Sequence, residues 1–180
     1  MSNIDYYIAN LERFPLSGFN VVDIAGGNTK VVAYHELQNY NSIEELLRPY
    51  GSVVLLFETK YNVGHYTCLY YDDNKNLYFF DPYGLEPDEE LKYESYNHTP
   101  YLTNLLSTYD KPINVNRFRY QQFSHDTNTC GRHVGVRLRT KEVFSPEGYQ
   151  HLLGAKDLRN SPDWYVSALT LLFTLKGRPF

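Results

Sequence analysis

The stretch HYTCLYYDDNKNLYFFD, residues 65–81, decides the fold because it predicts a β-hairpin. Aromatic and apolar residues dominate 65–71 and 77–81, and the polar residues 72–76 between them predict a turn. Side chains alternate across a strand, so a loop of odd length places His65 and Asp81 on one face. A loop over 72–74 would set them directly opposite, with Cβ atoms ~5 Å apart, and a loop over 72–76 would set them diagonally.

On one face of the hairpin, the Asp81 carboxylate would fix the tautomer of the His65 imidazole and stabilise its cation. That pairing is typical of a histidine that acts as a base. A loop of even length would instead place the two side chains on opposite faces. His65 would then be a surface histidine, and Asp81 would belong to the turn sequence Asp81-Pro82-Tyr83-Gly84.

The segments around the hairpin predict an α+β domain, with a central mixed β-sheet flanked by helices. The continuous apolar run 52–57 predicts a buried strand, and the alternation over 113–120 predicts another. Helix starts are expected at the capping box 42–45, at Thr99-Pro100, before Cys130, and at two Ser-Pro pairs, Ser145-Pro146 and Ser161-Pro162. The acidic segment 86–94 is expected to be solvated. With no linker or repeat, residues 1–180 form a single domain.

Composition excludes several classes of protein. The chain has 180 residues, a formal net charge of -4 and two cysteines, so neither a disulfide framework nor obligate nucleic-acid binding is indicated. No signal peptide and no apolar run of the ~20 residues that span a bilayer can be recognised. We therefore expect a soluble protein of a reducing cytosol, without membrane contact.

Cys130 is the candidate nucleophile. It follows the polar residues 127–129 at a predicted helix start, where the helix dipole and Arg132 favour a thiolate. Gly131 would let a substrate backbone approach closely. The alternative, a buried structural cysteine, suits Cys68 better, because Cys68 lies on the hairpin face opposite His65. Cys130 as nucleophile, His65 as base and Asp81 as the residue that orients the base together predict a cysteine peptidase.

Two further groups of residues could serve such a site. The side-chain amide of Gln121 or Gln122 could donate to an oxyanion together with the Cys130 backbone N–H, although both could be surface residues. His133 could compete as the base or join a metal site. Because the sequence has no CxxC or HxxxH pair, we expect neither a metal nor a cofactor.

Basic residues are concentrated in one part of the chain. Residues 111–141 hold seven Lys or Arg against one acidic residue, Asp126. Solvated side chains are the simpler explanation. The functional explanation is a basic patch that contacts nucleic acid weakly or binds an acidic segment of a substrate.

The ordered motifs resemble the adenain-type cysteine proteases, whose fold is shared with proteases of ubiquitin-like proteins. The motifs are Gly64-His65-Tyr66, 80–84 (FDPYG), Gln121-Gln122 and 129–133 (TCGRH). The segments 15–18 and 26–30 are similar to relatives in virophages and large double-stranded DNA viruses, and the resemblance covers about residues 15–140. Tyr66 stands where many relatives have Trp. The spacing from Gln to Cys130 is longer than in adenain, and we expect Gln122 to be the oxyanion donor.

The resemblance implies an adenain-like fold and a viral maturation endopeptidase that cleaves capsid protein precursors next to small residues such as Gly. It implies a place in the virion and in the host-cell cytoplasm, at the viral factory. Two alternatives stay open: a peptidase that removes ubiquitin-like modifiers, and a non-catalytic capsid or scaffold component with the same fold.

Overall fold

A computed structural model describes residues 3–60, 63–93, 99–155 and 158–176. Its centre is a five-stranded sheet in the order β1-β2-β3-β4-β5. The outer pairs β1/β2 and β4/β5 are parallel and the inner pairs antiparallel, so the predicted mixed sheet and α+β class are confirmed. The strands are β1 (Val31–Ala33), β2 (Ser52–Lys60), β3 (Val63–Tyr71), β4 (Leu77–Phe80) and β5 (Ile113–Val115).

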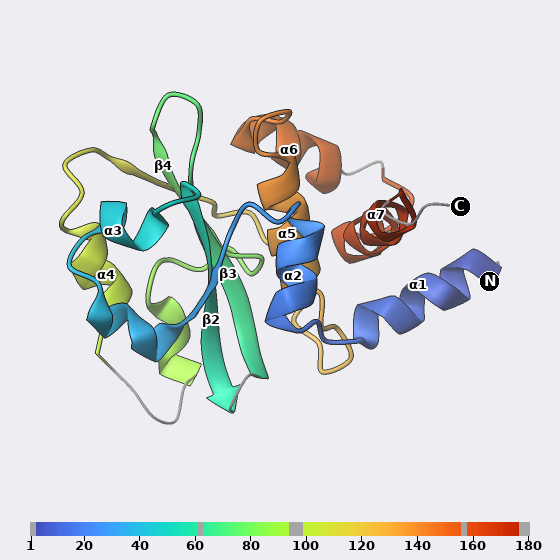
Figure 1. Cartoon of the computed structure of the whole chain (residues 1–180). Coiled ribbons are helices and arrows are strands. Elements are labelled where there is room, and N and C mark those ends of the chain that lie inside the picture. The colour runs from blue at the N-terminus through green and yellow to red at the C-terminus, as the bar shows by residue number, and fades with distance from the viewer. Residues whose placement is uncertain (1–2, 61–62, 94–98, 156–157, 177–180) are drawn as a thin grey trace.

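Helices cover both faces of this sheet (Figure 1). They are α1 (Asn3–Arg13), α2 (Gly18–Ile24), α3 (Ile43–Leu47), α4 (Tyr101–Leu106), α5 (Cys130–Thr140), α6 (Pro146–Gly154) and α7 (Pro162–Lys176), with 3-10 helices η1 (Tyr34–Asn39) and η2 (Glu89–Tyr93). None of the helices in the described residues is long and apolar enough to cross a membrane.

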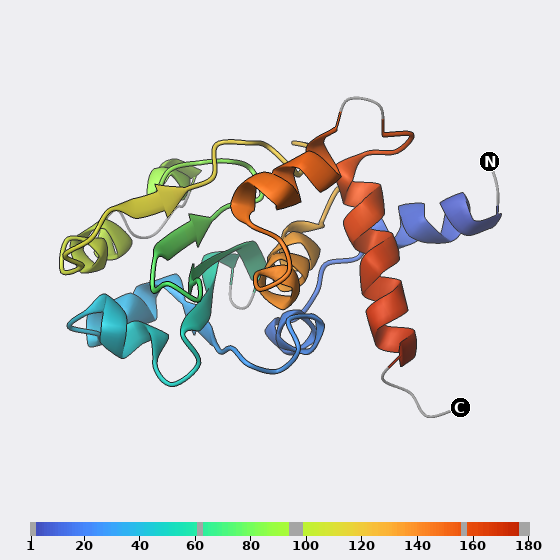
Figure 2. The same ribbon diagram turned by 90° about the horizontal axis from the view of Figure 1, so that it is seen from above.

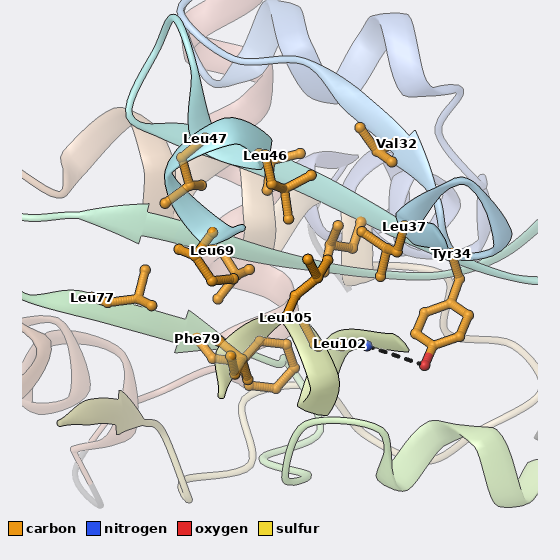
Figure 3. Packing of buried hydrophobic residues seen from close by; sticks show 14 of the residues in the cluster. Val32, Tyr34, Leu37, Leu46, Leu47, Leu69, Leu77, Phe79, Leu102 and Leu105 are labelled. Atoms are coloured by element: carbon orange, nitrogen blue, oxygen red, sulfur yellow. Dashed lines mark hydrogen bonds between the residues drawn. The ribbon is translucent and has the colours of Figure 1, made fainter. Parts of the chain in front are cut away.

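The first core lies between the sheet and α3, α4 and η1 (Figure 3). Ser42 caps α3 as predicted, because its hydroxyl accepts a hydrogen bond from Glu45 N at 3.2 Å. The predicted strand 52–57 is buried along its whole length. It has no polar face because its odd-numbered residues enter this core, whereas Val54 and Leu56 enter a second core on the opposite face of the sheet.

The second core lies on the other face, between the sheet and α2, α5, α6 and α7. Figure 2 shows α7 crossing beside α1 on the side of α5 away from the sheet. Cys68 is fully buried in this core, as predicted. Burial also raises the pKa of the Cys68 thiol far above its ordinary value, which makes it an inert core residue.

The hairpin has the longer of the two odd loops. Tyr71 pairs with Leu77, so residues 72–76 connect the strands. The Asp72 carboxylate closes this turn by accepting the backbone N–H of Asn74 at 2.9 Å and of Asn76 at 2.8 Å. In this register His65 and Asp81 are diagonal neighbours on one face.

The strand predicted over 113–120 is too long. β5 ends at Val115, because the Asn116 side chain turns back to bind the backbone of Asp81 and Phe118. The helix predicted to start at Thr99-Pro100 spans Tyr101–Leu106, with Pro100 rather than Thr99 at its N-cap. The predictions for α5, α6 and α7 are correct at their first residues.

Candidate active site

The site begins where β3 starts and β4 ends, because antiparallel neighbours bring these two points to the same end of the sheet. His65 Nε2 donates a hydrogen bond to Asp81 Oδ1 at 2.9 Å, and both side chains are buried. The same oxygen accepts the Tyr83 backbone N–H at 2.7 Å. Asn116 fixes the Asp81 backbone by accepting from its N–H at 2.8 Å and donating to its carbonyl at 2.7 Å. The carboxylate is therefore held firmly.

The imidazole of His65 contacts Asp81 through Nε2 and Tyr83 through the face of its ring. The Tyr83 ring stacks on it with centroids 4.5 Å apart and planes 15° apart. Burial alone would lower the pKa of His65, but the hydrogen bond to Asp81, followed by the contact with the Cys130 thiol, raises that pKa well above its ordinary value. Since Nε2 binds Asp81, the other ring nitrogen, Nδ1, is the one left for the thiol.

Cys130 reaches this pair from the other face of the sheet. It is the first residue of α5, it is partly exposed, and its thiol is near enough to His65 to raise the pKa of the imidazole. The structure thus brings together three residues that the sequence separates by as much as 65 positions. The partly exposed thiol beside a paired imidazole has the geometry of a nucleophile and its base.

The reason for glycine after Cys130 differs from the prediction. A Cβ atom at Gly131 would lie 2.8 Å from Val21 Cγ2, 3.3 Å from Tyr66 Cδ2 and 3.4 Å from Leu16 Cβ. The glycine therefore lets the start of α5 pack against α2 and β3. It does not open a path for a substrate backbone.

The two glutamines have different environments. The Gln122 side chain is exposed, whereas Gln121 is 1% exposed. Gln121 Nε2 donates to Thr127 O at 3.1 Å, in the loop that leads to Cys130. The amide held beside the loop that leads to Cys130 is therefore that of Gln121, whereas the side chain of Gln122, the predicted oxyanion donor, is exposed.

Glu90 is a residue that the sequence did not reveal. It was expected in a solvated acidic segment, but η2 buries it with Oε1 3.7 Å from His65 Nε2. Burial raises the pKa of Glu90 to about 6, although the charge of His65 lowers it. Ligand atoms of His65, Asp81 and Glu90 lie within 4.8 Å of one another, so this set could hold a metal ion. In the structure His65 Nε2 is already paired with Asp81.

His133 does not compete as the base. It is fully buried, and its Nε2 lies 3.0 Å from Asp163 Oδ1, away from the thiol.

Several cations of the predicted basic patch have partners inside the domain. Arg132 and Arg137 are buried, and Arg137 lies between the rings of Tyr70 and Tyr149. Lys141 Nζ donates to Tyr71 O at 3.2 Å. These cations contact groups of the protein itself, so they give no support to a nucleic-acid contact.

Comparisons with known proteins find a relative in a virophage. The chain is 36% identical over 150 residues to uncharacterized protein V9 of Sputnik virophage. The aligned region covers 79% of this chain and 83% of that protein. No family model matches. The central domain of the uncharacterized Lpg1148 protein from Legionella pneumophila is similar at a TM-score of 0.44 and 15% identity, over 90% of this chain and 99% of that one, too weakly to bear on fold or function. On the strength of the first match, the chain belongs to the family of the Sputnik virophage protein V9.

Proposed function

We propose that this virophage-family protein is a cysteine endopeptidase with an adenain-like arrangement of its site. The observation that supports it most is the buried His65–Asp81 hydrogen bond of 2.9 Å, with the Cys130 thiol near enough to the same imidazole to raise its pKa. A structural role alone would not need a partly exposed thiol at this point, because cysteines kept for packing are normally buried.

The chemistry follows from the positions of these groups. His65 Nδ1 takes the thiol proton, and the Cys130 sulfur attacks the scissile carbonyl carbon. The carbonyl oxygen becomes an oxyanion, which the Cys130 backbone N–H and the Gln121 amide stabilise. His65 then gives its proton to the leaving amine, and water hydrolyses the acyl-enzyme by the same route. Asp81 keeps the imidazole in the required tautomer throughout.

Capsid protein precursors are the substrates we propose, with cleavage next to small residues such as Gly, at the viral factory in the host-cell cytoplasm and in the virion. Membership of a virophage family supports this setting. The resemblance of the His65, Asp81 and Cys130 motifs to adenain-type proteases supports the reaction.

Co-expression with the major capsid protein of the same viral genome tests the proposal. We expect new protein termini, mapped by mass spectrometry, with the wild type and none with Cys130→Ala. Cys68→Ala is the matched control, because it removes the other thiol from a fully buried position. Equal cleavage by Cys130→Ala would refute the assignment.

Two labelling reactions separate the rival functions. Fast alkylation of Cys130 by iodoacetamide, with Cys68 slow, is expected for the proposed site. Labelling by a ubiquitin-like vinyl sulfone would redirect the proposal to the removal of ubiquitin-like modifiers. Slow alkylation of both thiols would favour a non-catalytic capsid or scaffold component.

A further inference from the structure

A buried carboxylate at the start of α7 connects the two segments that carry the proposed nucleophile and oxyanion donor. Asp163 is 2% exposed. Its Oδ1 accepts hydrogen bonds from the Thr129 hydroxyl and from His133 Nε2, the latter at 3.0 Å. Its Oδ2 accepts the backbone N–H of Gln122 at 3.0 Å. Thr129 directly precedes Cys130, and Gln122 directly follows Gln121.

The loop between these two tied points has other contacts at Phe123, whose ring stacks on Tyr83, and at Asn128, whose backbone N–H and side-chain amide donate to Glu12 O and Arg13 O at 2.7 and 2.9 Å. The side chains of 122–126 are exposed, and those of Thr127 and Asn128 only partly buried. Thr129 occupies the N-cap position of α5, yet its hydroxyl does not cap the helix, because it binds Asp163 instead. Threonine at this position usually accepts a backbone N–H of its own helix. Here that contact is replaced by one to an element more than thirty residues away.

A carboxylate has enough lone pairs on its two oxygens to accept from three donors, and burying one is costly unless such donors compensate. Its place in the first turn of α7 also suits a negative charge. The arrangement therefore ties the backbone on both sides of the loop to one rigid helix. Catalysis is sensitive to such ties, since a displacement of ~1 Å at a reacting group can cost ~10²-fold in rate.

We propose that Asp163 is a positioning residue of the peptidase, which holds Cys130 against His65 and Gln121 beside them. This inference rests on the proposed function. Asp163 does not touch the reacting atoms; it acts through Thr129, His133 and the Gln122 N–H.

The test compares Asp163→Asn with the wild type in two measurements: turnover of a peptide that spans a mapped cleavage site, and the alkylation rate of Cys130 by iodoacetamide. We expect kcat to fall ~100-fold with KM changed less than ~3-fold, and alkylation to slow ~10-fold. Glu147→Gln is the matched control, because Glu147 is an exposed acid in the first turn of α6. It should change neither rate.

Thermal unfolding of each variant separates positioning from stability. If Asp163→Asn does not fold, Thr129→Val decides by the same two measurements, since it removes one of the three hydrogen bonds and keeps a branched side chain. A folded variant with wild-type kcat and wild-type alkylation would overturn the inference. A wild type that neither cleaves nor alkylates quickly would instead refute the proposed function, so the two failures are distinguishable.

Discussion

Replacing Glu90 by Gln should stabilise the protein at neutral pH. Burial beside His65 and Asp81 raises the pKa of Glu90 from 4.5 to about 6, so the folded state binds the proton more tightly than the unfolded chain does. Ionisation of the folded state above pH 6 therefore costs stability. At 1.36 kcal/mol per unit of pKa, the cost reaches about 2 kcal/mol above pH 7 and disappears below about pH 4.5.

Urea unfolding of the wild type and Glu90→Gln between pH 4 and pH 8 measures this cost. We expect the variant to be more stable by about 2 kcal/mol at pH 7.5 and equal near pH 4, which corresponds to a difference of about 4–8 °C in Tm at the higher pH. Equal stability at pH 7.5, or a gain that grows as the pH falls, would refute the reasoning.

Glu89→Gln is the neighbouring control with the opposite sign. The Glu89 carboxylate accepts from Lys92 Nζ at 2.7 Å and from the Glu86 N–H at 3.0 Å. The hydrogen bond from Lys92 is the main reason why the pKa of Glu89 lies below its ordinary value. The neutral variant should therefore lose a little stability at pH 7.5, where Glu90→Gln gains it.

Three further outcomes are expected. Asp81→Asn should keep more residual kcat than Cys130→Ala, because the imidazole is also held by the Tyr83 ring; equal losses in a steady-state assay would argue against that order. Gln121→Ala should lower kcat ~10²- to 10³-fold and Gln122→Ala should not, and the reverse result would return the oxyanion role to the exposed residue. Gly131→Ala should lower the free energy of unfolding by about 1–3 kcal/mol in urea, since its methyl group has no room against Val21; unchanged stability would count against the packing described.

Much of the fold follows from local patterns in the sequence. The register of the hairpin was one of two odd-loop possibilities, and both kept His65 and Asp81 on one face. The start of α5 at Cys130 was visible because the polar residues 127–129, of types that cap helices, precede it. The sheet order was not predicted, because the parallel pairs β1/β2 and β4/β5 join segments that are remote in sequence.

The errors have a common physical cause. Whether a polar side chain is buried depends on partners that come from other elements. Gln121 and Gln122 are adjacent, and only the tertiary structure decides which amide turns inward. Arg137 looked like a surface cation, but Tyr70 and Tyr149 enclose it from a strand and a helix that the local sequence does not connect. Asp163 gave no signal beyond that of an acid at a helix start.

The Arg132 guanidinium, two residues after Cys130, binds both terminal helices, α1 and α7. It is 4% exposed, and burial lowers its pKa to about 10. Its acceptors are the Leu11 carbonyl, at the end of α1, and the Thr170 hydroxyl, in the middle of α7. A fragment trimmed to residues 15–140, the region of family resemblance, would retain every residue proposed for the chemistry. It would also leave the Arg132 cation near Cys130 with both acceptors gone, so we expect the smallest autonomously folding unit to extend well past the recognisable motifs at each end.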